Sequence, residues 1–135
     1  MRPELLAVAT LTAAVACSDA FLPTVDNMVG SYRARTFTVT DSTGTTDLLK
    51  AGATFDVTLG PRGATDGYVY IPAIGSAPEL VEEIHGTWTM SEGLIIIDQT
   101  GGTFLQNMGF FAYERQLYAS RSSPSIQVRS LMIKF

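Results

Sequence analysis

One cysteine and one histidine limit the chemistry open to this chain of 135 residues. Nucleophilic catalysis needs a nucleophile, a base within hydrogen-bond reach and an orienting group. The only imidazole, His85, stands in an alternating segment and is expected to face solvent. Glu82 and Glu83 are adjacent, so on a strand they point to opposite faces and cannot act as a pair. We therefore predict no catalytic site, no metal site and no cofactor. The thiol of Cys17 is the remaining group whose chemistry is considered.

The context of Cys17 is the strongest motif in the sequence. Arg2 gives the N-terminus a positive charge, and every residue from 5 to 15 is apolar or threonine, as in the apolar region of an export signal. A run of this length is too short to span a bilayer, which takes roughly 20 apolar residues. It ends at Ala14-Val15-Ala16-Cys17. This ending resembles the lipobox of bacterial lipoproteins, in which Leu is favoured at the position of Ala14.

The lipobox resemblance implies a processing route and a location. Residues 1–16 are then a lipoprotein signal peptide, and Cys17 receives a diacylglyceryl group and becomes a lipidated N-terminus. Residues 17–28 are then a tether, and several acyl chains hold a protein to a membrane better than one. Because Ser18 rather than Asp follows the cysteine, the outer membrane is favoured. The alternative is an ordinary signal peptide ending in Ala-x-Ala, with Cys17 as a free thiol.

From residue 29 onward the apolar residues alternate with a period of two, which is typical of strands. Turn sequences such as Gly60-Pro61-Arg62-Gly63 separate the alternating segments. The predicted strands are residues 33–40, 54–59, 67–71, 84–90, 94–97, 104–112, 117–121 and 126–135, with one helical turn at 47–50. Eight sequential strands leave two exposed edges unless the sheet closes. For residues 29–135 we therefore predict an all-β, eight-stranded antiparallel up-and-down barrel, with a two-sheet β-sandwich as the alternative.

Two short motifs resemble the Gly-x-Trp signature that opens the first strand of lipocalins. They are Gly30-Ser31-Tyr32 at the first strand and Gly86-Thr87-Trp88 in the fourth. In that family the aromatic residue closes the barrel floor, and a basic residue near the chain end packs across it. The resemblance therefore assigns barrel closure to Gly30, Tyr32 and Arg129. The chain after Cys17 is similar to the short lipocalin-like domains of bacterial lipoproteins.

An interior lined by aromatic residues is the predicted binding site. An eight-stranded barrel is either just filled by its side chains or holds one small ligand, and both alternatives stay open. The candidate interior residues are Phe37, Phe55, Val57, Tyr68, Trp88, Met90 and Phe111.

Arg33 and Arg35 fall on the same face as Phe37 in a regular strand. The favoured interpretation is a bulge that returns both guanidinium groups to water. In a regular strand they would enter the barrel and contact the carboxylate or phosphate of a ligand. A similar change of parity in the last strand predicts a second bulge near Ser130.

Composition and charge exclude some classes of function and leave two. Hydrophobic residues make up 46% of the chain and charged residues 16%, which is typical of a globular domain. The net charge is -4 and no basic face is apparent, so nucleic acid is not an expected partner. The favoured hypothesis is a membrane-anchored envelope protein, not an enzyme, that binds a small apolar or amphiphilic ligand. The alternative is a filled barrel whose long loops, residues 41–52 and 72–83, bind another envelope protein.

Overall fold

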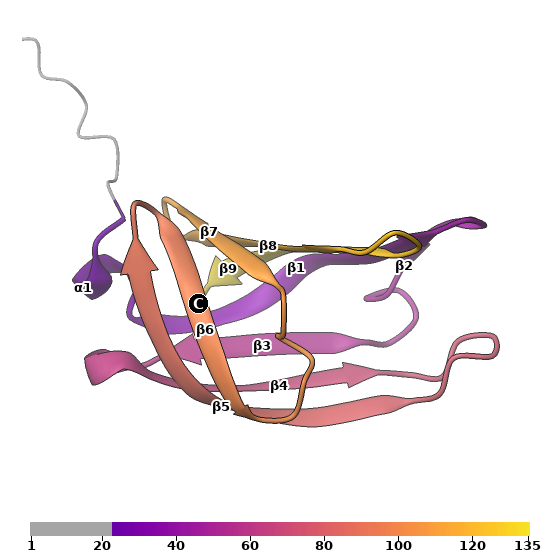
Figure 1. The fold of residues 1–135 in the computed structure, drawn as a ribbon, viewed down its shortest axis with the longest axis horizontal. Coiled ribbons are helices and arrows are strands. Elements are labelled where there is room, and N and C mark those ends of the chain that lie inside the picture. The colour runs from indigo at the N-terminus through magenta and orange to yellow at the C-terminus, as the bar shows by residue number, and fades with distance from the viewer. Residues whose placement is uncertain (1–22) are drawn as a thin grey trace, which may run out of the picture.

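A computed structural model describes residues 23–135, so Cys17 and the expected signal peptide lie outside the described residues. The described chain forms one short helix, α1 (Val25–Met28), a 3-10 turn at Pro61–Gly63, and nine strands (Figure 1). The strands are β1 (Gly30–Asp41), β2 (Gly44–Asp47), β3 (Thr54–Leu59), β4 (Ala64–Ile71), β5 (Leu80–Ser91), β6 (Leu94–Gly101), β7 (Gly109–Tyr113), β8 (Gln116–Ser122) and β9 (Gln127–Lys134).

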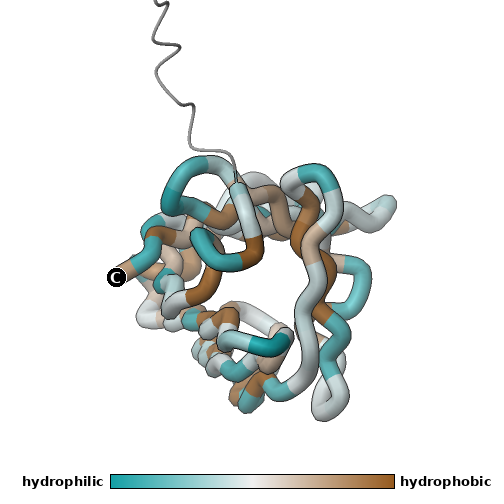
Figure 2. The backbone as a smooth tube through the Cα atoms, turned by 90° about the vertical axis from the view of Figure 1, so that its left-hand side faces the viewer, coloured by the Kyte–Doolittle hydropathy of each residue, from teal (hydrophilic) through white to brown (hydrophobic). Residues whose placement is uncertain are grey.

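Eight of these strands form a closed antiparallel barrel, as the sequence predicts. From β3 to β9 each strand pairs with the next along the chain, and β1 pairs with both β3 and β9. The pairing of β1 with β9 closes the ring, which Figure 2 shows roughly end-on, and it excludes a two-sheet sandwich. The extra strand, β2, pairs with residues 38–41 of β1. Its side chains are all exposed, so it lacks the apolar alternation by which the other strands are detected.

A β-bulge in β1 turns the arginines outward, which confirms the favoured interpretation. The register between β1 and β9 shifts between Ala34 and Thr36, so Arg35 is the extra residue. Phe37 is fully buried, whereas Arg35 is exposed and the side chain of Arg33 is 63% exposed. The bulge therefore lets both arginines face solvent while Phe37 points into the apolar barrel interior.

The last strand, β9, is regular, so the bulge predicted near Ser130 is wrong. Its buried residues, Val128, Ser130 and Met132, alternate strictly along the strand. Ser130 is tolerated inside because its hydroxyl donates a hydrogen bond of 2.8 Å to the carbonyl oxygen of Thr36. That carbonyl lies where the β1 bulge interrupts the ladder. The buried serine thus compensates for the bulge on the neighbouring strand.

Helix α1 and two aromatic residues close one end of the barrel. Met28 is fully buried, so the folded domain includes α1, a segment expected to belong to the tether. The hydroxyl of Tyr32 donates a hydrogen bond of 2.7 Å to the carbonyl oxygen of Met28, and burial raises the pKa of Tyr32 to about 12. Trp88 is buried at the same end and donates from Nε1 to the carbonyl oxygen of Gly60 at 2.8 Å.

Lys134, rather than Arg129, is the basic residue that packs across the start of β1. Its Nζ donates a hydrogen bond of 3.0 Å to the carbonyl oxygen of Asn27. Its side chain also covers Gly30 so closely that a Cβ at that position would meet Cε of Lys134. Arg129 is exposed and pairs with Thr38, roughly 25 Å along β1 from Gly30. Assigning Arg129 to barrel closure is therefore wrong.

Candidate functional site

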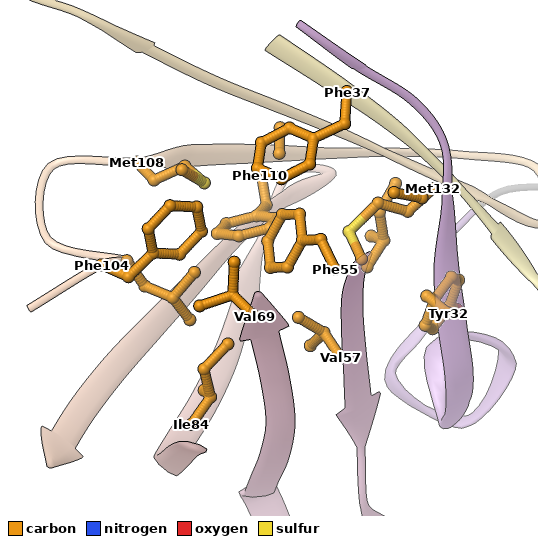
Figure 3. Close-up of a cluster of buried hydrophobic side chains, with 14 of the residues drawn as sticks. Tyr32, Phe37, Phe55, Val57, Val69, Ile84, Phe104, Met108, Phe110 and Met132 are labelled. Atoms are coloured by element: carbon orange, nitrogen blue, oxygen red, sulfur yellow. The ribbon is translucent and has the colours of Figure 1, made fainter. Parts of the chain in front are cut away.

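A cluster of buried aromatic and aliphatic side chains fills part of the barrel interior (Figure 3). The rings of Phe37, Phe55 and Phe104 contact one another, with centroids 5.2 Å to 6.2 Å apart. Phe104 meets each of the other two rings edge-on, an arrangement that aromatic pairs favour. The predicted interior residues that lie in or against this core are Phe37, Phe55, Val57, Trp88 and Met90.

Two residues predicted to line the interior, Tyr68 and Phe111, point outward instead. Tyr68 is 40% exposed and Phe111 is 55% exposed, whereas their neighbours Val69 and Phe110 are fully buried. Val69 faces the buried Phe55 across the β3–β4 ladder. Where two bulky residues are adjacent on a strand, one must point outward, and only the register decides which. Sequence reasoning therefore missed Phe110 as a core residue.

A gap in the barrel wall between β6 and β7 is filled by residues 102–108, which we call the plug loop. The strand β7 pairs with β6 only at Leu94 and Ile95. The rest of β6 has β5 on one side and the plug loop on the other. Phe104, Leu105 and Met108 are buried, and Figure 3 shows Phe104 and Met108 reaching the core from this loop.

The plug loop replaces the first half of a strand that the sequence pattern predicts at residues 104–112. Phe104 and Leu105 are adjacent and both buried, which a strand with one face in solvent does not allow. The chain turns instead: the N–H of Met108 donates to the carbonyl oxygen of Leu105 at 3.1 Å, and Asn107 has φ of 60°. Asparagine tolerates this left-handed conformation better than most residues.

Three polar side chains hold the backbone of the plug loop. Oε1 of Glu82 accepts hydrogen bonds from the N–H of Phe104 at 2.9 Å and from Nε2 of Gln99 at 2.6 Å. Oε1 of Gln99 accepts from the N–H of Leu105 at 2.9 Å. Arg121 donates to the carbonyl oxygen of Phe104 at 2.6 Å, and its guanidinium lies 5.5 Å from the centroid of the Phe104 ring. These contacts replace the hydrogen bonds that a neighbouring strand would provide.

The hydrogen bonds to Glu82 also set its ionisation. Burial acts to raise the pKa of its carboxyl group, but hydrogen bonds from Phe104, Gln99 and Thr103 stabilise the carboxylate and outweigh burial. The net effect is a lowered pKa. Glu82 therefore holds the plug loop as a charged acceptor at neutral pH.

A cleft of about 390 Å³ opens between β6 and the plug loop. Its walls are residues 94–99 and 105–109. Among the lining residues, Ile95, Leu105 and Met108 are buried and apolar, whereas Gln106 and Asn107 are exposed. The cleft also has polar walls, because Asp98 and Gln99 line it together with Gln106 and Asn107. A volume of this size is within the range of small-molecule sites.

The arginines considered as anion contacts lie outside the barrel. Nε of Arg33 donates to Oδ1 of Asp56 at 3.0 Å, and its guanidinium lies 4.6 Å from the ring centroid of Phe135. Arg35 is exposed at the bulge. Neither arginine lines the cleft.

His85 faces solvent on β5, with its two ring nitrogens 3.1 Å from Asp66 and 3.5 Å from Glu83. The hydrogen bond to Asp66 is the largest cause that raises the pKa of His85, and the hydrogen bond to Glu83 is the next. Across residues 23–135, no three His, Cys, Asp or Glu side chains are grouped as a metal site. In the same part of the chain, no helix has the length and apolar character needed to cross a membrane.

Comparisons with known proteins gave no match to a family model, a curated protein or a solved structure. The function is therefore inferred from the closed barrel, the plug loop and the cleft between β6 and that loop.

Proposed function

We propose that this chain is an exported, lipid-anchored barrel that binds one small apolar or amphiphilic molecule. The observation that carries the binding proposal is the cleft of about 390 Å³ between β6 and the plug loop. Beyond Ile95, β6 is not paired with β7, so a ligand reaches buried side chains there without breaking a ladder. The apolar part of the ligand would contact Ile95, Leu105 and Met108.

The polar residues of the cleft suit an amphiphile rather than a pure hydrocarbon. Gln106 and Asn107 are exposed and line the cleft, so their amide groups are placed to hydrogen-bond a headgroup. Ile97 lines the cleft on β6 and packs against the core, where an alkyl chain would lie. Apolar burial would supply most of the affinity, and the amides would orient the ligand.

Native mass spectrometry of residues 18–135 tests the binding. The protein would be extracted with mild organic solvent and then offered a mixture of fatty acids and phospholipids. We expect a one-to-one adduct that extraction removes and re-addition restores. Ile97→Trp, which fills the cleft, should abolish the adduct. Val81→Trp is the matched control, because Val81 is 55% exposed on β5 and does not line the cleft. An apo mass throughout, or equal adducts in both variants, would contradict binding in the cleft.

The lipid anchor is a separate part of the proposal and is supported by the lipobox resemblance at Ala14-Val15-Ala16-Cys17. Residues 17–23 span at most about 25 Å when extended, so the anchor would keep the barrel close to a bilayer, with the outer membrane favoured. Expression in a bacterial host should give a membrane-bound protein whose mass includes the acyl groups. Cys17→Ala should leave the membrane fraction. A Cys17→Ala protein that stays with the membrane would contradict the anchor.

The packed aromatic cluster supports a second candidate function, a filled barrel whose outer surface binds an envelope protein. Phe37, Phe55 and Phe104 already occupy the interior that an enclosed ligand would need. Under this alternative the extracted protein stays ligand-free in the experiment above. Protein partners would then be expected at residues 41–52, which include β2, and at residues 72–79, which precede β5.

A further inference from the structure

The outer surface of strands β6 to β9 carries a continuous row of apolar side chains. Leu94 is paired with Phe111, Phe111 with Tyr118, and Tyr118 with Leu131, so one row crosses four strands. Two residues further along their strands, Ile96 and Tyr113 point to the same side. We call these six residues, Leu94, Ile96, Phe111, Tyr113, Tyr118 and Leu131, the aromatic face.

The aromatic face is open to solvent. Ile96 is 52% exposed, Phe111 55% and Tyr113 69%. Single exposed apolar residues are ordinary, but a contiguous apolar patch on a protein surface marks an interaction site. The barrel core does not need these side chains, because the inward positions beside them, Ile95 and Phe110, are buried.

The part of the chain that bears most of the aromatic face is more basic than the opposite wall of the barrel. Residues 104–135 carry four basic and one acidic side chain, whereas residues 54–103 carry one basic and seven acidic. On the outer surface, Arg129 lies on β9 beside Leu131, and Arg35 lies on the adjoining strand β1. Arg33 also lies on β1, where it is paired with Asp56 at 3.0 Å. Acidic residues on the strands and turns of the aromatic face are Asp98 on β6, Glu92 in the β5–β6 turn and Glu114 in the β7–β8 turn. The flank formed by β1 and β9 is therefore predominantly basic.

The described chain begins beside the aromatic face. Pro23 lies against Gly93, in the turn that leads into β6, with its Cγ 3.8 Å from the position of a Cβ on Gly93. The carbonyl oxygen of Gly93 in turn accepts a hydrogen bond from Ala112 of β7. In Figure 1, α1 and the β7–β8 turn lie at the same end of the barrel. The chain therefore enters the barrel at the end where Tyr113 is exposed.

We propose that the aromatic face docks on the surface of a membrane that contains anionic lipids. Tyrosine and phenylalanine place their rings at the level of the lipid headgroups, and arginine binds lipid phosphate. The negative surface potential attracts the basic flank and repels the acidic wall of β3 to β5. This docking would hold the barrel in one orientation on the bilayer. It goes beyond the proposed function and needs neither the lipid on Cys17 nor a ligand in the cleft.

The test uses residues 18–135, which lack Cys17 and therefore any lipid anchor. The strand pairings and the described core all lie within residues 28–134, so the shortened chain retains them. Its sedimentation with phosphatidylcholine vesicles would be measured with and without phosphatidylglycerol. We expect binding that requires phosphatidylglycerol, and at least about a tenfold loss in the double variant Phe111→Ser, Tyr113→Ser. Tyr68→Ser is the matched control, because Tyr68 is exposed on the outer side of β4.

A second measurement reports which side of the barrel meets the lipid. Because residues 18–135 contain no cysteine, a polarity-sensitive dye can be attached at Tyr113→Cys or at Tyr68→Cys. Vesicles should shift the dye emission to the blue at position 113 and leave it unchanged at position 68. Absence of vesicle binding, or equal shifts at both positions, would overturn the proposal. A concentration-dependent dimer that the double variant abolishes, without vesicle binding, would show instead that the face joins two copies of this chain.

Discussion

Replacing Glu82 with glutamine should loosen the plug loop while leaving the barrel folded. Glu82 on β5 accepts a hydrogen bond of 2.9 Å from the N–H of Phe104 in the loop and one of 2.6 Å from Gln99 on β6. Glutamine has nearly the same shape and keeps one oxygen in place, but it removes the negative charge. The substitution therefore tests the charge of the acceptor rather than the packing.

The expected cost follows from the two charge-assisted hydrogen bonds. A hydrogen bond to a charged group contributes about 1.5–3 kcal/mol, and a neutral one about half as much. Glu82 is only partly buried, so solvent screening reduces the difference. We expect a loss of about 1–2 kcal/mol in the free energy of local opening, which corresponds to about a 5- to 30-fold increase in the open population.

Amide hydrogen exchange measures this opening directly. The N–H groups of Phe104 and Leu105 should exchange about 5- to 30-fold faster in Glu82→Gln, while buried amides of β3 and β4 keep their rates. Glu83→Gln is the matched control, because Glu83 is exposed on the other side of β5 and does not contact the loop. Equal acceleration in the two variants, or none in Glu82→Gln, would refute the role assigned to Glu82.

The same contact should weaken in acid. The folded-state pKa of Glu82 is lowered, so its contribution is fully present above the pKa of an unfolded glutamate. The contribution is lost as the pH falls through the folded-state pKa. Loop exchange, corrected for the intrinsic effect of pH, should therefore accelerate in acid in the wild type and converge with Glu82→Gln.

Three further predictions concern stability and titration. Thr65→Val should stabilise the protein by about 1 kcal/mol in urea unfolding, because the hydroxyl of Thr65 is buried without a hydrogen-bond partner; destabilisation would contradict this. Ser130→Ala should cost about 1–3 kcal/mol in the same assay, since it leaves the carbonyl oxygen of Thr36 without its bond from Oγ, and a neutral result would contradict it. Asp66→Asn should lower the pKa of His85 measured by NMR titration, because the hydrogen bond to Asp66 is the largest cause of its raised pKa; an unchanged pKa would show that Asp66 does not control it.

The alternation of apolar residues was sufficient to predict an eight-stranded antiparallel barrel. A half-buried strand must alternate, and a chain of short sequential strands removes its edges by closing. The bulge in β1 was also predictable, because two arginines could not share a face with Phe37 inside an apolar barrel. Turn residues such as Glu92 and Gly93 located a hairpin, and both have the positive φ that a two-residue turn requires.

Register decided which of two adjacent bulky residues is inside. Positions 110 and 111 are both phenylalanine, so residue type does not distinguish them. Phe110 is in the core because it pairs with the buried Ile95 and Ala119. Ser130 is the opposite case, a polar residue at a buried position. A serine inside a barrel is acceptable only because a distant carbonyl oxygen, that of Thr36, accepts its hydrogen bond.

By itself, then, the sequence determined the period of the strands and the turns between them, because each depends on neighbouring residues. The tertiary structure alone decided that residues 102–108 leave the sheet and fill a gap in the barrel wall. Glu82 and Arg121 stand 22 and 17 residues from Phe104 in the sequence, so spacing alone does not reveal that they hold the plug loop. The cleft exists because these long-range hydrogen bonds satisfy the loop backbone without a strand partner.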